Sequence, residues 1–167
     1  EAGGSTLVDV TVPGIGRDPA ALARLSRATG VHIVMGTGFY TEPSLDTSYR
    51  DMSIDAMAQM LIDDVIGGVG MTGIRAGIIG EIACNWPVAP TELKAVRAAA
   101  LAQQQTGAAI SLHPGRNREA PFELVRLLRQ SGANVARVVF CHTDARLTDP
   151  TDQLRLAGEG CVLEFDL

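Results

Sequence analysis

The chain has 167 residues, 46% of them hydrophobic, and a formal net charge of −5 at pH 7. This length and composition are typical of one globular domain with a substantial core, so we take residues 1–167 as a single domain. Acidic and basic residues are interspersed, which excludes a basic stripe for nucleic acid. No apolar run reaches the roughly 20 residues of a membrane-spanning helix, and the N-terminus has no signal-peptide pattern. We therefore expect a soluble, cytoplasmic protein that binds neither nucleic acid nor a membrane.

The first residues are typical of the end of an element. The chain begins at Glu1 without a methionine, and Glu1-Ala2-Gly3-Gly4 has the pattern of a helix end followed by its glycine stop. We therefore expect that one element of the fold comes before the first strand.

The first half of the chain predicts two strands and two helices. In chain order these are a strand at Thr6–Val12, a helix between Asp18 and Gly30, a strand at Val31–Gly36, a long polar loop at 37–52, and a helix that Ser53 caps. A loop of this length is usually functional, so we expect it to border a site.

The second half continues the alternation of apolar, β-rich runs with amphipathic stretches. In chain order we expect a strand at Arg75–Ala83, a helix from Thr91 to Gly107, a strand at Ala109–His113, a helix at Ala120–Gln130, a strand at Ala136–His142, a short helix at Thr151–Ala157 and a strand at Cys161–Leu167. This βαβ rhythm predicts an α/β fold with a parallel sheet.

Two parallel architectures compete, a doubly wound sheet and a closed (β/α)8 TIM barrel. A doubly wound nucleotide-binding domain needs a third glycine after its first strand, whereas Pro13-Gly14-Ile15-Gly16-Arg17-Asp18 has two and ends in an aspartate that repels phosphate. A complete barrel needs about 250 residues. We therefore predict an incomplete segment of a TIM barrel.

The three cysteines lie in or beside apolar runs. Cys84, Cys141 and Cys161 are odd in number, which favours reduced, packed thiols over a disulfide framework. Cys141 precedes a candidate metal ligand, and strand alternation predicts that its side chain points to the opposite face.

Three ionisable residues each end a predicted strand. Because the carboxyl ends of parallel strands meet at one mouth of a barrel, Glu81, His113 and His142 are expected to converge. Two imidazoles and a carboxylate suit Zn²⁺ or a similar divalent ion, and a glutamate that closes an apolar run is costly to bury without a cation. The alternative is two core histidines satisfied by hydrogen bonds. His32 opens its strand, so it belongs to the opposite end of the barrel and we assign it no role.

Several segments, in order along nearly the whole chain, strongly resemble the phosphotriesterase family of the amidohydrolase superfamily, and most of all its phosphotriesterase-related proteins. These segments are Val8-Asp9-Val10, Gly16-Arg17-Asp18, Val31 to Tyr40, Gly73 to Ile82, His113-Pro114-Gly115-Arg116-Asn117 and Cys141-His142-Thr143-Asp144. The resemblance implies that the chain covers about strands 2 to 7 of that barrel, without the strand 1 and strand 8 units. It is also the sole ground for expecting a homodimer.

The resemblance also implies a binuclear site with two divalent metal ions, zinc first, with Mn, Fe or Co also compatible. His113 and His142 then ligate one ion, and Glu81 bridges the pair. Phosphotriesterase itself uses a carboxylated lysine as the bridge, so Glu81 is a departure that puts phosphotriesterase activity in doubt. The family's His-x-His pair on strand 1 and its aspartate on strand 8 have no counterparts in this sequence.

The reaction expected of such a site is hydrolysis of a small-molecule substrate. A metal-activated hydroxide attacks a carboxylic ester, a lactone or an amide, and a phosphoester is disfavoured. Asp144 is the candidate for the proton relay, or else caps a turn. Tyr40 and Trp86 are candidate walls of the substrate pocket, with a rim or packing role as the alternative. Arg116 is placed to bind an anionic group, unless it is an exposed loop arginine.

A second hypothesis belongs to a different class of protein. In it the chain is a non-catalytic or truncated barrel segment that acts as a binding or assembly module, since open sheet edges need another strand to pair with. A barrel enzyme that uses one metal ion for decarboxylation or deamination is a third hypothesis, which the bridging position of Glu81 disfavours.

Overall fold

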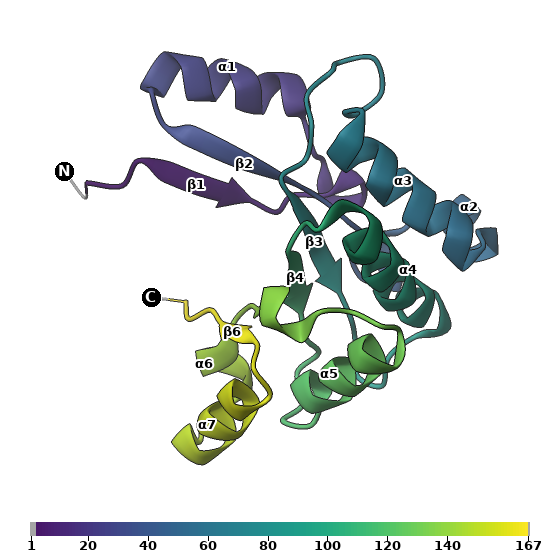
Figure 1. Cartoon of the computed structure of the whole chain (residues 1–167), viewed down its shortest axis with the longest axis vertical. Coiled ribbons are helices and arrows are strands. Elements are labelled where there is room, and N and C mark those ends of the chain that lie inside the picture. The colour runs from purple at the N-terminus through teal and green to yellow at the C-terminus, as the bar shows by residue number, and fades with distance from the viewer. Residues whose placement is uncertain (1–2, 167) are drawn as a thin grey trace.

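Figure 1 shows the computed structural model, which describes residues 3–166. The predicted helix end at residues 1–4 falls partly on Glu1 and Ala2, outside the described residues. The strands are β1 (Thr6–Asp9), β2 (His32–Thr37), β3 (Ile78–Ala83), β4 (Ile110–His113), β5 (Val138–Phe140) and β6 (Val162–Leu163). The helices are α1 (Pro19–Thr29), α2 (Thr47–Asp51), α3 (Ile54–Ile66), α4 (Pro90–Thr106), α5 (Ala120–Gln130), α6 (Thr143–Arg146) and α7 (Pro150–Gly158). Short 3-10 turns are η1 (Pro13–Ile15), η2 (Glu42–Ser44) and η3 (Val135–Arg137).

The sheet follows the winding of a barrel. All its neighbouring strands pair in parallel, and their order in space, β1-β2-β3-β4-β5-β6, is their order in the chain. A doubly wound sheet reverses its strand order at a switch point, which does not occur here. The helices cover one side of the sheet (Figure 1). The predicted α/β fold, an incomplete TIM barrel, is confirmed.

The helix ends predicted from capping residues are confirmed. The side chain of Asp18 accepts a hydrogen bond from the backbone nitrogen of Ala21, and Ser53 does the same for Ala56. Gly30 and Gly107 follow the last residues of α1 and α4 with φ of 73° and 70°, a left-handed conformation that favours glycine.

The predicted strands at 6–12, 75–83 and 136–142 are shorter in the structure, and two further segments differ more. The loop at 37–52 contains η2 and α2, because Pro43 suits the first turn of a 3-10 helix and the side chain of Asp46 caps α2. The predicted strand at Cys161–Leu167 is reduced to the two residues of β6, and Leu167 lies outside the described residues. β6 is an edge strand with a hydrogen-bonding partner on one side only, and its partner β5 is itself only three residues long.

The core lies between the sheet and the helices that cover it. Ile79, Ile82, Leu112 and Phe140 are fully buried there, each contributing roughly 1.5–3 kcal/mol relative to an exposed side chain. The alanines of α4 bring this helix close to β3 and α3; those buried are Ala95, Ala98, Ala99, Ala100 and Ala102. Among residues 3–166, no helix has the length and apolarity needed to cross a membrane. This core holds the carboxyl ends of the strands at fixed positions.

Candidate metal centre

The side of the sheet away from the helices forms a hollow of about 300 Å³. It is lined by Val8, Val10, Ile78, Glu81, Ser111, Val139, Cys141, His142 and Glu164. The wall is mostly apolar, and its ionisable groups come from the strand ends and the residues just after them. An ionic group at this position is therefore held against a low-dielectric surface, which strengthens its interaction with an opposite charge.

Glu81 reaches the hollow because β3 contains a bulge. Ile79 pairs with Ile110 and Ile82 with Leu112, so three steps along β3 correspond to two steps along β4. Strict alternation would send Ile78 and Glu81 to opposite faces, whereas both line the hollow. The extra residue changes the face of the sheet to which the side chain of Glu81 points, so its carboxylate lies in the hollow.

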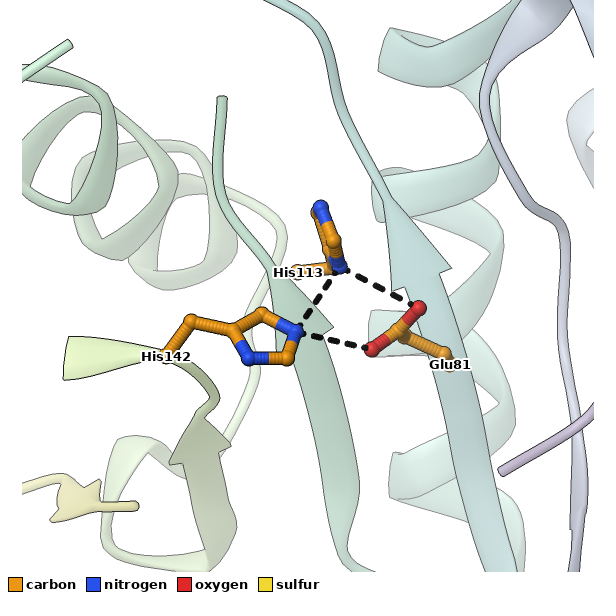
Figure 2. A group of neighbouring side chains, drawn as sticks. All are labelled: Glu81, His113 and His142. Atoms are coloured by element: carbon orange, nitrogen blue, oxygen red, sulfur yellow. Dashed lines mark hydrogen bonds and ion pairs between the residues drawn. The ribbon is translucent and has the colours of Figure 1, made fainter. Parts of the chain in front are cut away.

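The two histidines converge on Glu81 (Figure 2). His113 is the last residue of β4, and its Nδ1 lies 3.3 Å from Oε2 of Glu81. His142 follows Cys141 with a left-handed φ of 57°, and its Nε2 lies 3.7 Å from Oε1 of Glu81. The two ring nitrogens, His142 Nε2 and His113 Nδ1, are 3.1 Å apart. One ring nitrogen of each histidine thus faces the other histidine and one of the two oxygens of Glu81.

The spacing of these four atoms, two ring nitrogens and the two oxygens of Glu81, is in the range that a divalent ion requires of its ligands. Bond lengths of about 2.0–2.2 Å in tetrahedral geometry hold neighbouring ligand atoms about 3.4 Å apart. The observed separations of 3.1, 3.3 and 3.7 Å bracket that value. Two imidazole nitrogens and a carboxylate oxygen are also the ligand types that zinc and related ions prefer. The residues present therefore fit a metal ion.

Groups behind His142 hold its ring in the orientation that a ligand needs. Its Nδ1 lies 2.5 Å from a carboxylate oxygen of Asp166, and its backbone nitrogen donates to Glu164 at 2.8 Å. A carboxylate at Nδ1 keeps the ring proton there and leaves the Nε2 lone pair free for a metal. The hydrogen bond with His142 is also the main reason that the pKa of Asp166 lies below its usual range. Asp166 thus completes a carboxylate–histidine pair.

The prediction that Cys141 points away from the site is wrong. Cys141 lines the same hollow as His142, and its Sγ lies 3.1 Å from Oγ of Ser111. Cys141 keeps the alternation of Val139, which also faces the hollow, and the left-handed backbone of His142 then breaks it. Burial is the main factor that raises the pKa of the Cys141 thiol to about 11, and the hydrogen bond between Cys141 and Ser111 partly opposes it. The prediction of free thiols is confirmed for all three cysteines.

The structure brings some of the other predicted site residues to the metal group. The ring of Tyr40 meets the ring of His113 edge-on, with 5.6 Å between centroids. Asp144 accepts a hydrogen bond from the backbone nitrogen of Asp166 at 3.0 Å, which connects it to His142 through Asp166. Arg116 is exposed and lines a separate hollow with Arg146. Trp86 lies on the outer surface, where it lines a hollow with residues of α5.

Three residues at the site had no place in the sequence prediction. Arg146 lies 3.2 Å through its Nη2 from Nε2 of His113, while Glu164 and Asp166 contact His142. A signal for two of them was present, because Glu164 and Asp166 lie in the carboxyl-terminal half of the last predicted strand, much as the three ligands lie at the ends of theirs. Arg146 comes four residues after His142, a spacing that on a helix places both on one face.

A segment of parallel barrel that carries three side chains of the types that ligate metals, at the ends of three consecutive strands, is typical of TIM-barrel metal hydrolases. Within that class, a sequence profile of the phosphotriesterase family matches residues 1–167, and the chain belongs to this family.

The relatives agree with this assignment. The chain is 41% identical over 165 residues to the N-acetyltaurine hydrolase of Homo sapiens, covering 99% of this chain and 47% of that protein. It is also 41% identical over 165 residues to a phosphotriesterase-related protein of Nematostella vectensis, with the same coverage of 99% and 47%. The structure matches the phosphotriesterase homology protein of Escherichia coli, solved with phosphate in its active site, with a TM-score of 0.90, 30% identity, and coverage of 97% of this chain and 56% of that one. The chain thus spans about half the length of these proteins.

Proposed function

We propose that this chain carries part of the metal centre of a hydrolase that cleaves an amide, a carboxylic ester or a lactone. The observation that carries the proposal is the group Glu81, His113 and His142, whose ligand atoms lie 3.1–3.7 Å apart at three adjacent strand ends. Membership of the phosphotriesterase family supports it. The proposal includes two divalent ions, with zinc first and Mn, Fe or Co also compatible.

The orientation of Glu81 supports its role as the bridge between two ions. Its carboxylate turns one oxygen toward His113 and the other toward His142, so both oxygens are available on the side where ions would lie. Bound divalent ions lower the pKa of a coordinated water and polarise the oxygen of the group under attack. Glu81, His113 and His142 would hold such ions at the carboxyl ends of the strands.

Other residues of this chain orient the reacting groups. Tyr40 meets His113 edge-on, which puts its phenol beside the metal group, where a hydroxyl can donate to a substrate oxygen. Asp166 keeps the proton of His142 on Nδ1. Asp144 accepts from the backbone of Asp166, and in the proposal it receives the proton that the attacking water loses. Trp86 lies farther out, and in the proposal it contacts the outer portion of a substrate.

The relatives favour an amide with an anionic group as the substrate. One of them is named for hydrolysis of N-acetyltaurine, an amide that carries a sulfonate, and another was solved with phosphate in its active site. The exposed guanidinium of Arg116 supports the same substrate class in this chain, because arginine binds oxyanions through paired N–H donors. Neutral organophosphates lack an anionic group that Arg116 could bind.

The proposal is tested by measuring metal content and hydrolysis together. The full natural polypeptide that carries this chain is purified without chelator and compared with its Glu81→Ala variant, and with Asp55→Ala as a control for loss of an exposed carboxylate. We expect about two divalent ions per chain in the wild type and in the control, and loss of metal in Glu81→Ala. The same preparations are assayed with N-acetyltaurine and with a simple lactone. Absence of bound metal in the wild type would contradict the proposal and favour a binding or assembly module.

A further inference from the structure

A second hollow, of about 310 Å³, opens beside the metal group. It is lined by Arg116, Asn117, Arg118, Ala145 and Arg146. Its walls are the loop between β4 and α5 and the short helix α6, which are the segments that directly follow His113 and His142. The hollow is connected to the metal group through Arg146, which lines it and also contacts His113.

Two of the three arginines in this hollow have no carboxylate partner within residues 3–166. Arg118 pairs with Asp152 at 2.9 Å and lies 3.7 Å from Glu119, so its charge is compensated. Arg116 makes no side-chain hydrogen bond or ion pair with a described residue. Arg146 donates from Nε to the backbone oxygen of Pro114 at 2.9 Å and makes no ion pair in the described part of the chain. The hollow thus holds two guanidinium groups that make no ion pair with a described carboxylate, although the charge of Arg146 also acts on the nearby Asp166.

Arg146 connects this hollow to the metal group through His113. Its Nη2 lies 3.2 Å from Nε2 of His113, and the opposite ring atom, Nδ1, is the one that faces Glu81. When Nδ1 binds a metal ion, the neutral imidazole carries its proton on Nε2. Two N–H donors, from Arg146 and from His113, then face each other without an acceptor between them. Such a pair is satisfied by an oxygen that accepts from both.

We propose that Arg116 and Arg146 form a subsite for an oxyanion, a carboxylate or a sulfonate, at the end of an amide substrate. The inference rests on the proposed function, because the amide must reach the metal group on the other side of His113. An oxyanion accepts from both guanidinium groups and from Nε2 of His113, and its charge is opposite to that of the two arginines. The imidazole ring of His113 separates the anion subsite from the metal group. A substrate that reaches both therefore needs a short carbon spacer between its anionic group and its amide. Arg146 is thus a residue that determines specificity.

The test compares amides that differ only in the terminal group. N-acetyl-β-alanine presents a carboxylate, its sulfonate analogue presents a sulfonate, and N-acetylethanolamine presents a neutral hydroxyl. These are assayed with the full natural polypeptide and with Arg116→Gln, Arg146→Gln and Arg118→Gln. Arg118→Gln is the matched control, since it removes an arginine of the same hollow whose charge is already paired. Metal content is measured for every variant.

We expect Arg116→Gln and Arg146→Gln to raise the KM for the anionic amides by about 10-fold or more, because each removes a hydrogen bond to a charged group. The KM for the neutral amide and the metal content should stay within about 2-fold of wild type. The ratio of the effects on the two anionic amides identifies which oxyanion the subsite prefers. Calorimetric titration with acetate and with sulfate gives a readout apart from activity, and both variants should bind these ions more weakly than Arg118→Gln does.

Two results would contradict the anion subsite, and a third would contradict the proposed metal-dependent function while leaving the subsite in place. If the wild type binds metal and cleaves the neutral amide as efficiently as the anionic ones, the subsite is wrong and the proposed hydrolase stands. If Arg146→Gln raises the KM for the neutral amide as much as the KM for the anionic amides, Arg146 acts on His113 alone. The anion subsite is then also wrong. If instead acetate and sulfate bind through Arg116 and Arg146 but no divalent metal binds, the subsite stands and the proposed function fails.

Discussion

His142 and Asp166 form a carboxylate–imidazole pair in which Nδ1 lies 2.5 Å from the carboxylate while Nε2 faces Glu81. Such a partner fixes the tautomer and orientation of a metal-binding histidine, and its loss typically weakens metal affinity 10–100-fold, on the order of 1–3 kcal/mol. We therefore predict that Asp166→Ala raises the dissociation constant for zinc by about 10-fold or more, with a smaller effect for Asp166→Asn, whose amide oxygen still accepts.

Competition with a chromophoric chelator measures this constant. Asp55→Ala, which removes an exposed carboxylate on α3, serves as the control and should bind metal as the wild type does. An unchanged zinc affinity in Asp166→Ala would show that the backbone alone holds His142 in place.

Gly38 lies so close to Glu81 that a side chain does not fit between them. A Cβ atom at Gly38 would come within 2.4 Å of the carbonyl oxygen of Glu81. Because that oxygen belongs to the backbone, β3 must move to accept the methyl group, and we predict that Gly38→Ala destabilises the fold by about 1–3 kcal/mol. The shift also moves Glu81, so zinc affinity should fall in the same variant.

Gly158 provides the matched control for this substitution. A Cβ atom at Gly158 would meet nothing within 4 Å, and the residue ends α7. Gly158→Ala should therefore leave the free energy of unfolding unchanged or raise it by up to about 1 kcal/mol. Urea denaturation measures both variants, and equal stability of the two would contradict the close contact at Gly38.

The convergence of Glu81, His113 and His142 was predictable because it depends on topology alone. Alternation of strands and helices predicts parallel strands, and parallel strands in a barrel end at one mouth. The sequence places each of the three residues at the end of an apolar run, so their proximity follows without knowledge of any side-chain conformation. The same rule applied to the last strand would have found Asp166.

The direction of individual side chains was less predictable. The prediction for Cys141 assumed strict alternation up to His142, whereas the left-handed φ of His142 sends both residues to the same hollow. The bulge before Ile82 that turns Glu81 inward depends in the same way on how β3 pairs with β4. Both features arise from contacts between distant segments, which a local pattern does not contain.

Glu92 fixes two loops at the mouth of the barrel. Its carboxylate is fully buried and accepts hydrogen bonds of 2.7–3.0 Å from four N–H groups. These donors are the backbone nitrogens of Glu42, Asn85 and Ala89 and the side-chain amide of Asn85. The first belongs to the segment after Tyr40, and the others to the segment that carries Trp86. The sequence placed Glu92 only at the start of the helix predicted from Thr91 to Gly107.

We predict that Glu92→Gln lowers the free energy of unfolding by about 3 kcal/mol, because an amide nitrogen would replace one acceptor oxygen and leave buried donors unsatisfied. Urea denaturation measures the change. Glu119→Gln is the control, since the side chain of Glu119 is 52% exposed and a surface ion pair contributes at most about 1 kcal/mol. A loss of less than about 1 kcal/mol in Glu92→Gln would mean that water replaces the lost acceptor.

Cys84 gives the fold a dependence on alkaline pH. Burial, and secondarily the negative charge of Glu92, raise the pKa of its thiol well above the ordinary value of 9.0. The folded state therefore favours the neutral thiol, whereas the unfolded chain loses this proton above about pH 9. The resulting stabilisation is complete below pH 9 and declines as the pH rises above it, by at most about 1.4 kcal/mol per pH unit.

We predict that the free energy of unfolding of the wild type falls more steeply between about pH 9 and 10.5 than that of Cys84→Ala. Comparing slopes in one denaturation series cancels the contribution of other groups that titrate in this range, and it also cancels the constant cost of removing the buried sulfur. Below pH 9 the two curves should run parallel. Cys161 is half-buried and its thiol pKa is also raised, so Cys161→Ala is a comparison in which we expect a smaller change of slope. Equal slopes for the wild type and Cys84→Ala would mean that the folded protein admits water to Cys84 and lets its thiolate form.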